Sequence, residues 1–98
     1  MVEGFDLGLS EHRKEIEVID EKIIRLIDQR NKMAKNVFEA KKQEGLGISD
    51  PEQERLVLGR AMDLATELNL DAGAVTDIFN ILIRMSLQKQ REFLGKDQ

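Results

Sequence analysis

Residues 10–44, SEHRKEIEVIDEKIIRLIDQRNKMAKNVFEAKKQE, decide the fold because apolar side chains recur along the stretch at helical spacing. Ser10 is a candidate N-cap, and the glycines in Gly45-Leu46-Gly47 end the pattern. The apolar stripe covers most of the stretch and consists of Ile16, Ile19, Ile23, Leu26, Ile27, Met33, Ala34 and Val37. The stretch therefore predicts one long amphipathic helix.

Two shorter helices are predicted after it. The run Ser49-Asp50-Pro51-Glu52 combines capping-box spacing with a proline in the first turn, so a helix is expected from there to residue 67 or 68. Asp71 is the expected N-cap of a third helix that continues to about Leu94. No stretch alternates apolar and polar residues as a strand would, so the predicted fold class is all-α.

Composition excludes several classes of function. The 98 residues suffice for one small domain, 1–98, with flexible ends expected at 1–9 and 95–98. With no cysteine, disulfides and thiolate metal sites are excluded, and with one histidine a zinc site built from protein ligands alone is not expected. The net charge of −4 argues against a general nucleic-acid binder. No apolar run could span a membrane and no signal peptide is recognisable, so a cytoplasmic location is expected.

The length of the first predicted helix implies a second chain. At 1.5 Å per residue it would be a rod of roughly 50 Å, whereas a compact monomer of this size has a radius of gyration of about 13 Å. Such a rod extends beyond any globule that one chain can build, and part of its apolar stripe would be left uncovered. A second copy is the most economical cover, so we expect an intertwined helical homodimer.

Polar residues interrupt the apolar faces of all three predicted helices. They are Arg13, Arg30 and Lys41 on the first, Gln53 and Glu54 on the second, and Ser86 and Gln90 on the third. Burying an unpaired ion costs several kcal/mol, and the only evident acid on these faces is Glu54. A ligand with more than one carboxylate would balance the remaining positive charge, and arginine binds carboxylates through two parallel hydrogen bonds.

The same residues also allow an interpretation without a ligand. Lysine and arginine on an apolar stripe can extend their charged ends to water. Ser86 and Gln90 can set the register of a helical core, and Glu54 suits the positive end of a helix dipole. The combination of positions, more than any one of them, favours a ligand site.

Three segments resemble the all-helical class of chorismate mutases: HRKEIEVIDEKIIRLIDQRNKMAKNVFEAK (12–41), ISDPEQERL (48–56) and FNILIRMSLQKQ (79–90). The resemblance extends from Leu9 to Leu94. Its most specific feature is an arginine, a second arginine seventeen residues on and a lysine eleven beyond, followed by D-x-x-x-E and S-x-x-x-Q. The family's intertwined dimer, with one long and two shorter helices per chain, agrees with the rod length.

The resemblance implies an isomerase that converts chorismate to prephenate in phenylalanine and tyrosine biosynthesis. This unimolecular rearrangement needs no nucleophile, metal or cofactor. Catalysis would rest on orienting the dicarboxylate and on stabilising charge at the ether oxygen of the breaking bond. The implied catalytic residues are Lys41 and Gln90, which donate to that oxygen, and Arg30, which clamps a carboxylate.

The same resemblance implies further substrate-binding roles. Arg13 would reach from one subunit into the site of the other. Asp50 and Glu54 match positions that hold the substrate hydroxyl, and Ser86 matches a carboxylate contact. Gln53 departs from the family, because many relatives carry an arginine there. Glutamine brings no charge, so affinity for the substrate is expected to be weaker.

Two other functions remain open from the sequence. An isochorismate-pyruvate lyase shares this scaffold and its dicarboxylate clamp, although D-P-E-x-E with S-x-x-x-Q favours the mutase. A non-catalytic helical dimerisation module would instead pair the stripe cations across its interface.

Overall fold

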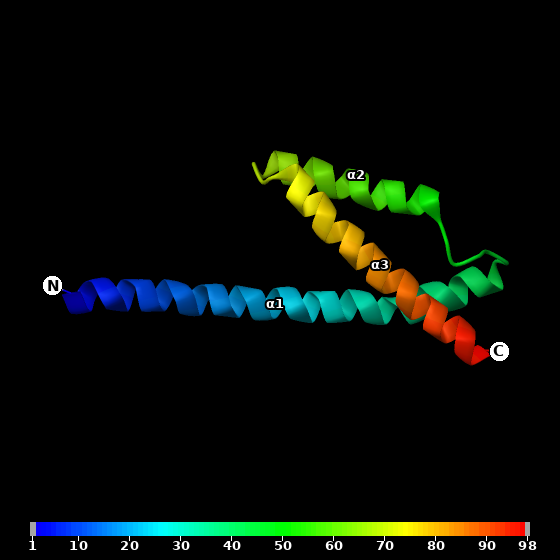
Figure 1. Cartoon of the computed structure of the whole chain (residues 1–98), viewed down its shortest axis with the longest axis horizontal. Helices are drawn as coiled ribbons and strands as arrows, with labels where there is room; N and C mark the ends of the chain where they lie inside the picture. The colour runs from blue at the N-terminus through cyan, green and yellow to red at the C-terminus, as the bar shows by residue number, and fades with distance from the viewer. Residues whose placement is uncertain (1, 98) are drawn as a thin grey trace.

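The computed structural model describes the backbone of residues 2–97 and the side chains of residues 8–96. Within that range it consists of three helices, α1 (Val2–Gln43), α2 (Pro51–Glu67) and α3 (Ala72–Asp97), and contains no strand (Figure 1). The predicted all-α class, with one long and two shorter helices, is confirmed. Over the described residues, none of these helices is long and apolar enough to cross a membrane.

Both chain ends are more helical than predicted. α1 begins at Val2, so the prediction that Ser10 caps it is wrong. Extending a helix that has already nucleated adds one hydrogen bond for each residue fixed, and glycines weaken such an extension without blocking it. α3 likewise continues past Leu94 to Asp97. The predicted flexibility of the two ends stays a prediction.

The caps of the shorter helices are acidic. Asp50, and not Ser49, is the N-cap of α2: its carboxylate accepts a hydrogen bond from the backbone N–H of Gln53, and the capping box predicted at Ser49 is wrong. α2 opens with proline, which suits the first helical position and leaves the preceding aspartate as the cap. Asp71 caps α3 as predicted, accepting from the N–H of Ala74 at 3.1 Å.

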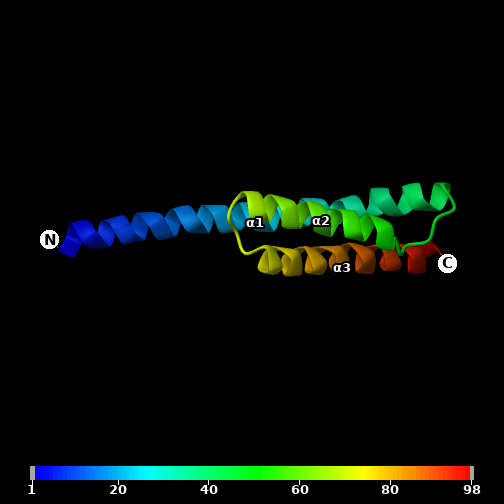
Figure 2. The same ribbon diagram turned by 90° about the horizontal axis from the view of Figure 1, so that it is seen from above.

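α3 is the helix that packs against both others. Asn69, with φ of +57°, makes the short turn after α2. Figure 2 shows α3 displaced to one side of both α1 and α2. The core is small and its buried apolar residues are Ala34, Phe38, Ala61, Ala65 and Ile83. The rings of Phe38 and Phe93, with centroids 6.1 Å apart, join α1 to α3 near the end of both helices.

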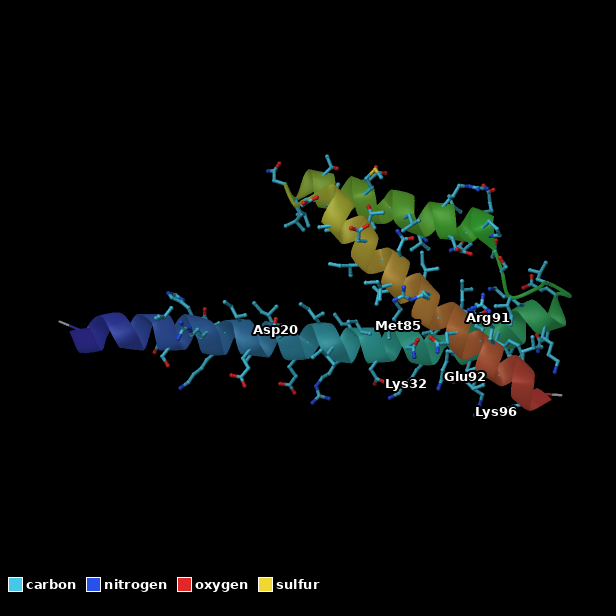
Figure 3. All side chains as sticks on the ribbon, viewed as in Figure 1. Asp20, Lys32, Met85, Arg91, Glu92 and Lys96 are labelled. Atoms are coloured by element: carbon cyan, nitrogen blue, oxygen red, sulfur yellow. The ribbon has the colours of Figure 1, made fainter. Side chains whose placement is uncertain are left out.

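Much of α1 lies beyond the other helices. The radius of gyration is 18.6 Å and the longest dimension is 66 Å, well above the roughly 13 Å radius of a compact chain. We call residues 8–26 the projecting segment and residues 30–41 the packed segment. Figure 3 shows Asp20 on the projecting segment with neither α2 nor α3 beside it. The apolar stripe there is open to solvent; Ile23, for example, is 50% exposed.

Candidate active site

A cavity of about 490 Å³ lies among the three helices, beside the packed segment of α1. Its volume is in the range of sites for small ligands. The apolar part of its wall consists of Met33, Ala34, Val37, Val57, Ile83 and Leu87. The polar part consists of Arg30, Lys41, Asp50, Gln53, Glu54, Arg60, Ser86 and Gln90. An apolar cavity with a few converging polar groups is the usual form of a site for a small molecule.

A chain of hydrogen bonds joins α1 to α3 at one end of the cavity. The Nζ of Lys41 donates to the Oε1 of Gln90 at 3.0 Å, and the Nε2 of Gln90 donates to the Oγ of Ser86 at 3.1 Å. Gln90 is only 2% exposed, so this contact holds its amide in one orientation. Because the Ser86 hydroxyl accepts from Gln90, its own proton remains available to a ligand, as does the second amide proton of Gln90.

The turn after α1 fixes the position of Lys41. Gly45 adopts the left-handed conformation with φ of +72°, and the N–H of Leu46 donates to the carbonyl of Lys41 at 2.8 Å, which closes the helix. The chain then returns so that the carbonyl of Ile48 accepts from the Nζ of Lys41 at 2.5 Å. An ammonium group has three N–H donors, so one remains for a ligand.

Arg30 is held at mid-helix. It is half-buried, and its Nη1 donates to the backbone carbonyl of Leu82 on α3 at 3.3 Å. Along the described chain, neither Arg30 nor Lys41 forms an ion pair with an acidic side chain. Two cations on the cavity wall therefore lack an anionic partner, which is the condition that the charge pattern predicted.

The start of α2 supplies the acidic groups of the wall and a second side-chain amide, that of Gln53. Asp50 and Glu54 are half-buried, whereas Gln53 is exposed. All predicted site residues except Arg13 thus line one cavity. Arg13 lies on the exposed projecting segment, seventeen residues and about 25 Å along α1 from Arg30. No side chain could span that distance within one chain.

Arg60 lines the cavity but was missed from the sequence. It follows Gln53 by seven residues, and residues seven apart share nearly the same face of a helix. That spacing was the available signal, since Gln53 is one of the polar residues that interrupt the apolar face of this helix.

This fold and this cavity define a helical protein with a cavity for a small molecule, lined by cations and hydrogen-bond donors. The model of the chorismate mutase type II family matches residues 12–91. A chorismate mutase of Methanocaldococcus jannaschii is 42% identical over 90 residues, which cover 92% of this chain and 91% of that protein.

Two longer proteins are also similar. The bifunctional chorismate mutase/prephenate dehydratase of Escherichia coli K12 is 32% identical over 82 residues, 84% of this chain and 21% of that protein. The corresponding bifunctional protein of Aquifex aeolicus is 43% identical over 60 residues, 61% of this chain and 17% of that protein. The chain thus spans about a fifth of the length of such bifunctional relatives. It belongs to the chorismate mutase type II family.

Proposed function

We propose that this protein is an isomerase that rearranges chorismate to prephenate, a step of phenylalanine and tyrosine biosynthesis. The observation that carries the proposal is the cavity wall, where Lys41 and Gln90 lie together and Arg30 lacks an acidic partner. Chorismate carries two carboxylates and an ether oxygen. These groups match the cationic and hydrogen-bond-donating side chains of the wall.

The mechanism follows from orientation and charge. The reaction is unimolecular, so its barrier falls when the substrate is held in the compact conformer that brings the reacting carbons together. Arg30 clamps one carboxylate, and the free hydroxyl proton of Ser86 reaches a carboxylate as well. As the C–O bond breaks, negative charge grows on the ether oxygen. The remaining donors of Lys41 and Gln90 stabilise that charge, and their fixed positions spare the cost of reorganisation.

The start of α2 holds the rest of the substrate. We assign Asp50 and Glu54 to the substrate hydroxyl, since both line the cavity and both are half-buried. Gln53 is on the same wall and can offer a neutral hydrogen bond to a carboxylate. The assignment uses no metal and no cofactor.

The active form is an intertwined homodimer in which Arg13 enters the site of the neighbouring subunit. Two features support this proposal. The apolar stripe of the projecting segment is open to solvent, and a second copy of the same segment is an apolar surface of matching length. Arg13 lies on that segment, too far along α1 to serve its own cavity. A cytoplasmic location remains a prediction from the sequence.

A direct assay tests the function. Purified protein should convert chorismate to prephenate and should leave isochorismate unchanged. The loss of chorismate absorbance measures the reaction. Pyruvate release from isochorismate without prephenate formation would favour the lyase. Sedimentation should give twice the chain mass; a dimer that turns over neither compound would be the non-catalytic module.

A further inference from the structure

Arg60 is a cation that lines the cavity, and the proposed mechanism assigns it no role. It lies on α2, its side chain is exposed at the cavity, and no hydrogen bond or ion pair engages it in the part of the chain that the structure describes. Gln53 lies on the same face of the helix, two turns earlier. Arg60 and Gln53 therefore line the same wall of the cavity, and of these two α2 side chains only Arg60 is charged.

The other two cations of the wall are already engaged. Arg30 donates to the carbonyl of Leu82, and Lys41 donates to the carbonyl of Ile48 and to the side chain of Gln90. No hydrogen bond or ion pair among the described residues uses the guanidinium group of Arg60, so its five N–H donors, arranged in a planar fork, remain for a ligand. A carboxylate can accept two parallel hydrogen bonds from such a fork.

Charge on the wall gives a second reason. Without Arg60, the two positive charges of Arg30 and Lys41 equal in number the two negative charges of Asp50 and Glu54, although no ion pair joins them, so the net charge of the wall would be zero. Arg60 makes the wall of one subunit cationic. Because Gln53 is neutral, α2 has no other cation on this wall.

Arg55 is the nearer arginine in the sequence, but its side chain is used elsewhere. Its Nη2 donates to the carboxylate of Glu52 at 2.7 Å, and it does not line the cavity. It shares α2 with Arg60 and carries the same charge. Arg55 is therefore a matched control for any general effect of positive charge on this helix.

We propose that Arg60 binds a carboxylate of the substrate and supplies from α2 the positive charge that Gln53 lacks. The proposal rests on the proposed chorismate mutase function. Arg60 contributes to substrate binding from α2, whereas the Lys41–Gln90 pair that faces the breaking bond belongs to α1 and α3. Its loss should therefore raise KM more than it lowers kcat.

The test compares Arg60→Gln with Arg55→Gln in steady-state chorismate assays. Hydrogen bonds to charged groups contribute enough for a tenfold to hundredfold change, so Arg60→Gln should raise KM by about that factor. Arg55→Gln should leave KM within about twofold of the parent protein. Equal KM values for the two variants would overturn the role of Arg60. Absence of turnover in the parent protein would instead overturn the proposed function itself.

A rescue experiment separates substrate binding from a structural role. In the Arg60→Gln background, Gln53→Arg restores one guanidinium group to the same face of α2 and should recover most of the lost affinity. Failure of the rescue, together with a lower melting temperature of Arg60→Gln, would show a structural role and contradict the proposal. Arg60→Lys keeps the charge without the fork and should give an intermediate KM. Should Arg60→Gln not fold, the KM of Arg60→Lys decides: a value equal to that of the parent protein contradicts the proposal.

If Arg60→Gln sediments as a monomer while its KM is unchanged, the side chain acts at the subunit interface. That result would also overturn the proposal. Sedimentation of the same protein samples gives this measurement.

Discussion

The two segments of α1 share one helix and one apolar periodicity, yet they differ in what covers them. In the packed segment, Ala34 is 1% exposed and Phe38 is 6% exposed, because α3 crosses the helix there. In the projecting segment, Ile16 and Ile23 are at least half exposed. An amphipathic pattern thus predicts the helix and its apolar face, but it does not say which element covers that face.

Side-chain chemistry also differs between the segments. The projecting segment carries large aliphatic residues on its stripe, which suit a long and uniform contact with another helix. The packed segment carries the small Ala34, which lets α3 approach closely, and the cations Arg30 and Lys41. We infer that one segment holds the site and the other the association of two chains. Four changes test this division.

The largest effect is expected in the packed segment from Lys41→Ala. Removing one preorganised donor to a developing oxyanion lowers kcat by about 10²–10³. Lys35→Ala, on the same segment but outside the cavity wall, is the control and should keep full turnover. Sedimentation should show both variants as dimers. Undiminished turnover in Lys41→Ala would contradict the catalytic assignment.

In the projecting segment, Ile23→Asp should weaken the dimer by a factor on the order of a hundred. An unpaired carboxylate buried in an apolar interface costs several kcal/mol. Turnover should fall with it, because Arg13 would no longer reach a neighbouring site. Lys14→Asp puts a carboxylate on the opposite face of the helix and should leave the mass unchanged in analytical ultracentrifugation. A stable dimer in Ile23→Asp would mean that the stripe is not the interface.

A smaller and pH-dependent effect is expected for Gln90→Glu. A carboxyl group donates a hydrogen bond only when protonated, so activity should be low at neutral pH and should rise as the pH falls. Gln88→Glu, exposed on the same helix, should retain the pH profile of the parent protein. If the activity of Gln90→Glu depends on pH in the same way as that of the parent protein, Gln90 does not donate to the ether oxygen.

The smallest effect concerns the cap that sets the α2 wall opposite the packed segment. Loss of an N-cap costs about 0.5–2 kcal/mol, so Asp50→Ala should lower the free energy of unfolding by that amount in urea denaturation. Ser49→Ala should change it by less than about 0.5 kcal/mol, since its side chain does not cap α2. A larger loss of unfolding free energy in Ser49→Ala than in Asp50→Ala would instead support the capping box predicted from the sequence.

Much of the fold was predictable because helix signals are local. The glycine after α1, the proline that opens α2 and Asp71 before α3 each mark a boundary by their own backbone preferences. The predictions that Ser10 and Ser49 cap helices were wrong because they too used only local signals. A serine is a good cap only where the helix actually starts, and neighbouring residues decided that in both places.

The candidate site was only partly predictable. Arg30 and Lys41 stood out because charged residues on an apolar stripe need a partner, and Ser86 with Gln90 stood out on α3 for a similar reason. Arg60 did not stand out, since an arginine at the edge of a helix face resembles any solvated residue until the opposite wall is known.

The sequence by itself determined three helices, the apolar face of each and the positions of the polar residues on those faces. These properties depend on periodicity and on caps, which act over a few residues. Only the tertiary structure decided which half of α1 is covered, that Lys41 meets Gln90, and that Arg60 borders the same cavity. These contacts join residues far apart in the chain, and they depend on the turns at Gly45 and Asn69 and on the close packing at Ala34.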